Sequence, residues 1–215
     1  SDVCSSDLGA CDQIDPEMTT AFLTLRLLGI VSFVSSGNEQ FKNGMGFPAC
    51  VASVVSVGAV WDAAQGLISM GGCTDPTAAD LVTCWSNSDS SLDLLAPGAL
   101  IRAAGLNGGT ATYGGTSMAA PTAAGVAALL LEANKNAGMT PAQQSSFVET
   151  TLESTGVLVT DPKNGVQTPR VDALAAVHSK IPPDVRIVSP NGGESVAGLV
   201  TVSAEATDPN GVEYV

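Results

Sequence analysis

Hydrophobic residues along this chain follow two patterns, and together these predict its helices and strands. In residues 16–29 apolar side chains recur at helical spacing, Asp15 can cap the first turn, and Gly29 can end the helix. Residues 30–34 and 51–60 are apolar and rich in β-branched side chains, as in the buried strands of parallel sheets. Two further short strands are expected at residues 81–85 and 92–95.

Helical patterns return in the second half of the chain. Residues 120–133 are apolar nearly all round, which predicts a helix that is buried on most sides. Thr140 is placed to cap a helix over residues 141–153, and a last short helix is expected at residues 171–179. Helices that alternate with short buried strands predict an α/β fold, with a mainly parallel sheet flanked by helices.

The pattern changes after residue 180. Residues 181–186 include paired prolines, which cannot continue a helix, and therefore predict a linker. Strands are expected at residues 185–188 and 200–204, with turns at residues 190–193 and 208–211. Residues 187–215 thus look like the start of an Ig-like β module, truncated because a sandwich needs about seven strands to close.

The two ends of the chain look unlike those of a complete protein. Residues 1–10 lack helical or strand periodicity, and residues 1–8 resemble the translation of a sequencing adaptor. A non-native or unstructured leader is therefore expected at residues 1–10. The chain also stops at Val215, inside an expected strand. The main domain is expected to span residues 11–180 and to be a fragment.

Composition argues against several kinds of partner. Eight Lys and Arg against 21 Asp and Glu give a net charge of −13, which disfavours binding to nucleic acid or to an anionic membrane. No apolar run reaches the roughly 18 residues that a membrane span requires. No acidic cluster has the spacing of a calcium loop, so neither a metal nor a cofactor is expected.

Two short motifs carry candidate chemistry. Residues 114–121 read Gly-Gly-Thr-Ser-Met-Ala-Ala-Pro and lead into a predicted helix. Ser117 would then lie at a helix N-terminus, where free backbone N–H groups favour developing negative charge. Residues 35–38, Ser-Ser-Gly-Asn, follow a predicted strand, at the edge where open α/β sheets bind ligands. Asn38 can there donate a hydrogen bond to an oxyanion.

At these motifs, and over roughly residues 11–179, the chain resembles the subtilisin-like serine peptidases, or subtilases. The resemblance implies a secreted or cell-surface endopeptidase that cleaves polypeptides through an acyl-enzyme at Ser117, with Asn38 as the oxyanion donor. Phe47-Pro48 matches a family position that is often a cis peptide bond. A propeptide is a further possible partner. The resemblance also implies a set of substrate-binding residues, namely Ser35, Ser36, Gly37, Gly46, Phe47, Gly115 and Thr116.

The chain also departs from the family pattern. A serine triad needs a His to accept the serine proton and an Asp to orient that His. Family members carry these in Asp-Ser/Thr-Gly and His-Gly-Thr motifs that precede the serine, and neither motif is present. The only histidine is His178, expected on the surface near a helix end. The triad Asp and His are expected upstream, in sequence that this chain lacks, so the fragment should be inactive alone. Thr122 also replaces a common family His outside the triad.

The cysteines point to an oxidising compartment. If Cys4 belongs to the leader, four remain: Cys11, Cys50, Cys73 and Cys84. An even set in a peptidase of this kind suggests two disulfides. Four cysteines allow three pairings. The favoured one joins Cys73 to Cys84, which closes a short loop, and leaves Cys11 to pair with Cys50. Buried free thiols are the alternative.

Two other functions remain open at this stage. One is a pseudo-peptidase or surface binding protein whose β-rich tail does the binding. The other is an α/β-hydrolase-type esterase that uses Ser117, His178 and either Asp161 or Asp172. Against the esterase, residues 115–119 do not form the Gly-x-Ser-x-Gly elbow, and Asp172 precedes His178 by only six residues.

Overall fold

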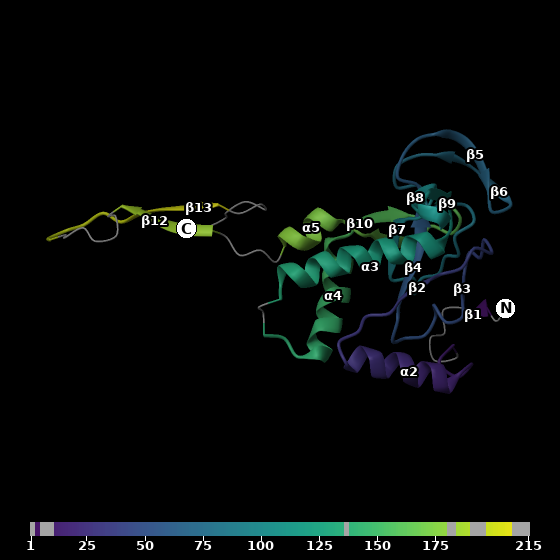
Figure 1. The fold of residues 1–215 in the computed structure, drawn as a ribbon, viewed down its shortest axis with the longest axis horizontal. Coiled ribbons are helices and arrows are strands. Elements are labelled where there is room, and N and C mark those ends of the chain that lie inside the picture. Colours follow the sequence, from purple (N-terminus) through teal and green to yellow (C-terminus); the bar gives the residue numbers. More distant parts are fainter. Residues whose placement is uncertain (1–2, 5–10, 136–137, 180–183, 190–196, 208–215) are drawn as a thin grey trace.

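A five-stranded sheet forms the centre of the computed structural model, which describes residues 3–4, 11–135, 138–179, 184–189 and 197–207 (Figure 1). The strand order is β10-β11-β7-β4-β2. β2, β4, β7 and β11 pair in parallel, and β10 is antiparallel at the edge beyond β11. The predicted α/β class with a mainly parallel sheet is confirmed. The strands are β2 (Phe33–Ser35), β4 (Val55–Val60), β7 (Leu94–Pro97), β10 (Val157–Thr160) and β11 (Gln167–Arg170).

Helices flank the sheet as the hydrophobic pattern predicts. They are α2 (Pro16–Leu27), α3 (Thr116–Ala133), α4 (Pro141–Thr155) and α5 (Ala173–His178). Local signals set their starts. The Asp15 carboxylate accepts from the Met18 N–H, and Thr140 and Gln143 form a reciprocal capping box at α4. α3 begins four residues earlier than expected, at Thr116, so Ser117 lies within its first turn.

The core lies on both faces of the central strands. All six residues of β4 are buried, and alternate positions face opposite sides. Val57 and Leu94 belong to the cluster that includes the buried side of α3, whereas Val60 and Leu95 belong to a second cluster that includes Cys11 and Cys50. The sheet thus holds the carboxyl ends of β2, β4 and β7 rigidly in one row.

α3 is less enclosed than its sequence predicts. It packs on β2, β4 and β7, and seven of its residues are buried, but Leu129 on its outer side is 58% exposed. The expectation that this helix is buried on most sides is therefore wrong, because the described residues cover one side only. Among the described helices, α3 alone has the length and composition of a membrane span, and its packing against three strands makes it the core helix of the sheet.

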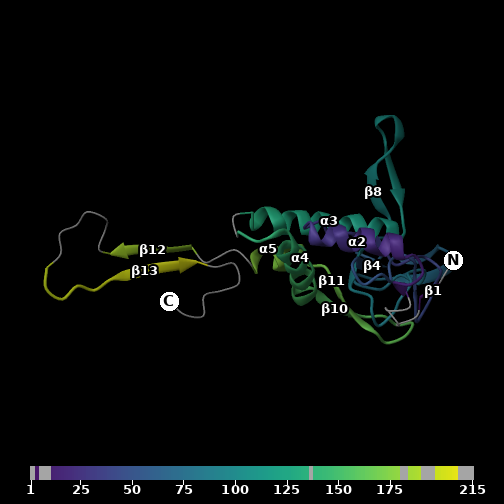
Figure 2. The same cartoon turned by 90° about the horizontal axis from the view of Figure 1, so that it is seen from below.

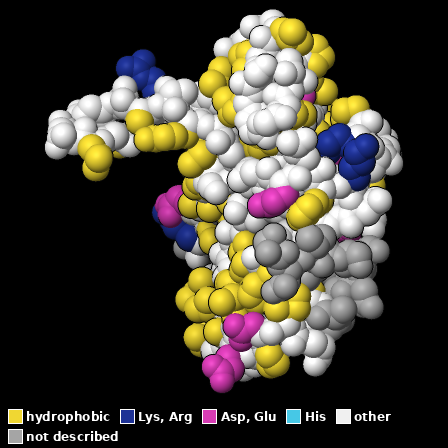
Figure 3. Space-filling view, turned by 90° about the vertical axis from the view of Figure 1, so that its right-hand side faces the viewer, with side chains coloured by type: hydrophobic (Ala, Val, Ile, Leu, Met, Phe, Trp, Pro, Cys, Tyr) yellow, Lys and Arg dark blue, Asp and Glu magenta, His cyan; other side chains and the backbone are white. Residues whose placement is uncertain are grey.

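α2 also leaves apolar surface uncovered. None of its residues is fully buried. Figure 3 shows hydrophobic side chains gathered over the lower part of the molecule, where Figure 1 places α2. The exposed apolar side chains of this helix and the residue that follows it are Met18, Leu23, Leu27 and Leu28.

Short paired strands surround the sheet, and most of them were not expected from the sequence. β5 (Gly66–Met70) pairs with β6 (Cys73–Thr77), β8 (Ile101–Ala104) with β9 (Thr110–Tyr113), and β1 (Val3–Cys4) with β3 (Met45–Gly46). The β8–β9 hairpin, with a short 3₁₀ turn at Leu106–Gly108, projects from the N-terminal end of α3 (Figure 2). β1 falls inside the stretch for which an unstructured leader was expected.

The strand expected at residues 81–85 is wrong. Val82 makes only an isolated bridge to Val60, and a turn follows in which the Ser86 N–H donates to the Thr83 carbonyl. Beyond the sheet, β12 (Asp184–Ser189) pairs with β13 (Ser203–Thr207), which begins three residues later than expected. The first half of the predicted linker (residues 181–183) and the turns at residues 190–193 and 208–211 lie outside the described residues, while residues 184–186, the second half of that linker, belong to β12.

Candidate active site

Ser117 lies in the first turn of α3, where β9 ends and the helix begins. Its side chain is exposed, while Thr116 beside it is fully buried. The Gly115 N–H donates to the Gly98 carbonyl at 2.8 Å, which ties the start of the helix to the end of β7. The serine hydroxyl is thus presented at the carboxyl edge of the sheet by a rigid helix terminus.

Asn38 lies directly beside this helix start. Its Oδ1 accepts from the Thr116 N–H at 3.0 Å and from the Thr116 hydroxyl at 3.1 Å. The Gly37 N–H in turn donates to the Thr116 hydroxyl at 3.2 Å. Because two donors hold Oδ1, the Nδ2 amide, which has no protein partner among the described residues, is the end that can donate to another molecule.

The other predicted binding residues cluster around the same edge. The Ser36 carbonyl accepts from the Gly46 N–H at 3.0 Å, so β3 lies against the turn that follows β2. The predicted cis peptide bond at Phe47-Pro48 is present, and Phe47 is half-buried. Ser36 and Gly46 are therefore brought together beside the turn, and Gly37, Gly115 and Thr116 lie next to Asn38.

An open groove of about 450 Å³ runs beside Ser117. β2 is the last strand of the sheet, so one of its edges carries no strand partner among the described residues. The groove is lined by Val31, Phe33, Val34, Ser35, Ser117, Ala120, Pro121 and Ala124. None of these is a His, Asp or Glu, so this lining places no candidate general base beside the Ser117 hydroxyl.

His178 is not brought to Ser117. It is the last residue of α5, which lies at the end of α3 remote from the β8–β9 hairpin (Figures 1 and 2). Asp172 caps α5 by accepting from the Ala175 N–H, and Asp161 pairs with Lys163. The alternative triad of an α/β-hydrolase is therefore not assembled.

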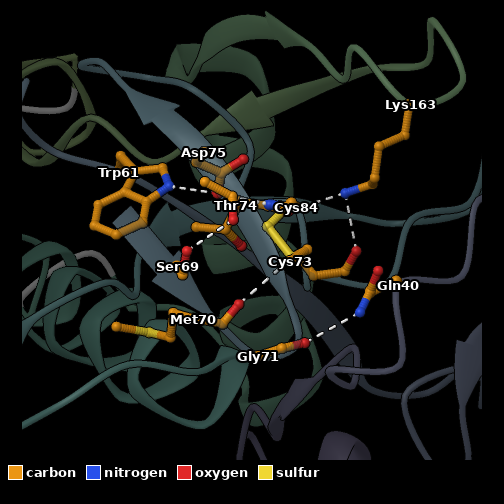
Figure 4. The surroundings of a disulfide bond; sticks show 12 residues. Gln40, Trp61, Ser69, Met70, Gly71, Cys73, Thr74, Asp75, Cys84 and Lys163 are labelled. Atoms are coloured by element: carbon orange, nitrogen blue, oxygen red, sulfur yellow. Dashed lines mark hydrogen bonds between the residues drawn. A yellow bond between two sulfur atoms is a disulfide. The ribbon is translucent and has the colours of Figure 1, made fainter. Parts of the chain in front are cut away.

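The β5–β6 hairpin, which a disulfide links to the segment that follows it, contacts the segments that carry Asn38 and Ser117. Both favoured pairs are present, Cys11–Cys50 and Cys73–Cys84. Figure 4 shows the second pair beside Asp75, whose Oδ2 accepts from the Trp61 indole and from the Cys84 N–H. The Gly71 carbonyl at the hairpin tip accepts from the Gln40 side chain at 3.1 Å.

The tip of this hairpin also reaches the residues before Ser117. A Cβ added to Gly114 would lie 2.4 Å from the Met70 sulfur, so only glycine fits there without movement. The hairpin therefore touches both segments of the site, through Gln40 and through Gly114. Nothing in the local pattern of residues 66–77 signals this role, because it arises from contacts between distant segments.

The shifted pKa values belong to groups away from Ser117. Burial raises the pKa of Asp93, which precedes β7 and accepts from the Ser56 N–H and hydroxyl, and burial also raises the pKa of Glu153. Asp93, Glu149 and Glu153 form a cluster of converging carboxylates in the described structure, and Arg26 already pairs with Glu149. This cluster sits at the amino end of β7, opposite to the site.

Comparison with known proteins gives matches along nearly the whole chain. Residues 2–175 match the model of the subtilase family, and residues 183–215 match that of a bacterial Ig domain. The alkaline serine exoprotease A of Vibrio alginolyticus is 34% identical over 138 residues, which is 64% of this chain and 22% of that protein. The subtilisin of Bacillus pumilus is 36% identical over 132 residues, 60% of this chain and 41% of the relative.

Solved structures give the same result. The prenylagaramide maturation protease PagA superposes with a TM-score of 0.62 at 25% identity, over 82% of this chain and 58% of that one. A cold-adapted subtilisin-like serine proteinase superposes with a TM-score of 0.54 at 29% identity, over 74% of this chain and 51% of that one. The matched residues cover 22% of the Vibrio alginolyticus protease and 41% of the Bacillus pumilus subtilisin, so this chain spans less than half the length of either. With its sheet order, its Ser117 and Asn38 segments and the family match over residues 2–175, the chain belongs to the subtilase family.

Proposed function

We propose that these residues form the C-terminal part of the catalytic domain of a serine endopeptidase. Ser117 attacks the carbonyl carbon of a peptide bond and forms an acyl-enzyme, while the Asn38 Nδ2 donates to the oxyanion that develops. The observation that carries the proposal is the orientation of Asn38. Its oxygen is held by Thr116, immediately before the nucleophile, which leaves the amide to face the reacting centre.

The general base and its carboxylate partner are supplied by residues outside these 215. The groove beside Ser117 is open along the free edge of β2, which leaves room for an imidazole to approach the serine hydroxyl. Because triad members act as a unit, the chain on its own should keep at most the roughly 10³–10⁴-fold acceleration over water that an oxyanion donor and substrate binding supply without a triad.

The substrate is a polypeptide that lies across the carboxyl ends of β2 and β7. The residues proposed to contact it are Ser35, Ser36, Gly37, Gly46, Phe47, Gly115 and Thr116. Two disulfides in the described structure favour an extracellular or cell-surface location, because disulfides persist in oxidising compartments. A propeptide that occupies the same groove before activation is a further proposed partner.

The test uses protein expressed from the whole reading frame that encodes these residues. Peptide hydrolysis should be abolished in Ser117→Ala. In Asn38→Ala, kcat should fall about a hundred- to a thousand-fold with little change in KM, a range taken from removal of such a donor in a subtilisin. Asn134→Ala, which alters an asparagine at the other end of α3, is the matched control and should keep full activity. Hydrolysis that survives Ser117→Ala would refute the proposal.

A further inference from the structure

We propose that Asn87 is a positioning residue for the oxyanion donor: it folds the turn of residues 36–41 that carries Asn38. The inference rests on the proposed function. Asn87 lies in the connection between β6 and β7 and is completely buried. Its side chain bonds to the neighbours of Asn38 and not to Asn38 itself, and it reaches the turn from a segment distant in the sequence.

Every hydrogen-bonding position of the Asn87 side chain is used on this turn. Its Oδ1 accepts from the Glu39 N–H and from the Phe41 N–H, both at 3.0 Å. Its Nδ2 donates to the Ser36 carbonyl at 3.0 Å and to the Glu39 carboxylate at 2.7 Å. A side-chain amide offers two donors and two acceptor positions, so Asn87 satisfies backbone groups on both sides of Asn38.

Backbone contacts and close packing fix the same geometry. The Asn87 N–H donates to the Gly37 carbonyl at 3.0 Å. A Cβ added to Gly37, which has a φ of +105°, would lie only 2.3 Å from the Asn87 Nδ2. The turn therefore fits around the Asn87 amide only because residue 37 is a glycine.

Asn38 is thus held from two directions. Thr116 fixes its side-chain oxygen, and Asn87 fixes the backbone on either side of it. Donors that stabilise an oxyanion act through preorganisation, and a misplacement of about 1 Å can lower turnover a hundred-fold. The role assigned to Asn87 is to prevent such a displacement.

Asn87 is itself firmly supported. Its carbonyl accepts from the Ser36 and Ser86 hydroxyls at 3.2 and 3.1 Å. Beneath it, the Lys163 ammonium donates to the Thr83 and Ser86 carbonyls, at 3.0 and 2.9 Å. These bonds make the connection a rigid base for the turn.

Hydrogen exchange on the 215-residue chain tests whether Asn87 sets the turn. In Asn87→Ala the Glu39 and Phe41 amides lose their acceptor and should exchange at least ten-fold faster. Ser91→Ala is the matched control: it removes a half-buried hydroxyl from the same connection, one that donates to the Asp89 carboxylate at 2.7 Å and not to the turn. It should leave those two amides protected. Equal exchange in Asn87→Ala and the parent chain would overturn the proposal.

A kinetic experiment tests whether the turn affects turnover through Asn38. It uses protein expressed from the whole reading frame. Asn87→Ala should lower kcat about ten- to a hundred-fold with KM nearly unchanged. In the Asn38→Ala background the same change should have almost no further effect, because the donor that Asn87 positions is already absent. Additive losses in the double variant, or an unchanged kcat in Asn87→Ala, would assign Asn87 to folding alone.

A conservative pair gives a rescue test. Asn87→Asp keeps the acceptors for Glu39 and Phe41 but places a carboxylate against the Glu39 carboxylate, so kcat should fall. Adding Glu39→Gln restores a donor between the two side chains and should recover much of that loss; no recovery would contradict the role given to this bond. If turnover by the parent protein does not depend on Ser117, the proposed function is refuted. The hydrogen-exchange result would still decide whether Asn87 sets the turn.

Discussion

The two sides of the Ser117 groove are built in opposite ways. On the turn side, which comprises residues 36–41 with Asn87 and Thr116, polar groups are matched by hydrogen bonds in a largely buried network. On the groove side, which comprises β2 and the adjoining face of α3, the surface is apolar and the β2 edge is unpaired in the described structure.

This difference separates two parts of the chemistry. In the proposed function, the Asn38 amide that stabilises negative charge must be preorganised, and Thr116 and Asn87 hold the turn that carries it. The group that accepts the proton is proposed to come from residues outside these 215, and the groove lining that it would approach is uncovered in the described structure. An apolar surface that also includes the outer side of α2 is typical of a place where further protein packs.

The largest effect on stability should come from substitutions on the buried face of α3, compared with its exposed face. Leu130 is fully buried and Leu129 is 58% exposed. Leu130→Ala should lower the free energy of unfolding of the 215-residue chain by about 2–5 kcal/mol, whereas Leu129→Ala should change it by less than about 0.5 kcal/mol. Urea unfolding measures both. In protein from the whole reading frame, a larger loss for Leu129→Ala would show that the outer side of α3 is covered there.

Removing each disulfide tests which of them supports the turn of residues 36–41. Loop lengths predict that removal of Cys73–Cys84 by paired serines lowers the free energy of unfolding by about 3 kcal/mol, and removal of Cys11–Cys50 by about 4 kcal/mol. Only the former should also speed hydrogen exchange of the Gln40 region, because only that hairpin contacts Gln40. Equal effects of the two pairs on that exchange would remove the hairpin from the account of the site.

The smallest effect should be a pH response at the end of the sheet opposite to the site. Burial raises the pKa of Asp93, so the folded chain holds its proton to higher pH than the unfolded chain does. Between the Asp93 pKa of the unfolded chain and that of the folded chain, the free energy of unfolding should therefore fall as pH rises. The fall is at most ~1.4 kcal/mol per pH unit for one proton. Below the ordinary aspartate pKa the penalty is absent, and above the raised pKa it is fully present.

Urea unfolding from about pH 4 upward checks this response. Asp93→Asn should flatten the dependence, while Glu132→Gln, which alters an exposed carboxylate, should leave it unchanged. Glu153, whose pKa burial also raises, contributes in the same direction. A slope of opposite sign in this range would contradict the burial of Asp93.

Elements with local signals could be predicted from the sequence. α4 has its capping box and Pro141 at its first turn, and β4 is an uninterrupted buried run. Residues 81–85 have the same apolar character, yet Val82 alone bridges to β4, because Lys163 holds the following turn by its carbonyls. That decision depends on a residue 80 positions away in the chain.

The same distinction divides the site. Ser117 and Asn38 lie in short motifs, and the few residues of each motif are enough to predict its chemistry. Asn87 stands in a run of small polar residues that looks like an exposed loop, yet it is fully buried and its side chain bonds to the distant turn of residues 36–41. The exposure of α3 was missed for a related reason: a helix that is apolar all round does not show which of its neighbours are present.

The most direct test of the central claim is to map the adduct of a fluorophosphonate probe by mass spectrometry. With protein from the whole reading frame, the account predicts one dominant adduct, on Ser117, and it predicts only background labelling of the 215-residue chain alone. Strong labelling of the 215-residue chain that is lost in His178→Ala, or a dominant adduct on a residue other than Ser117, would contradict it.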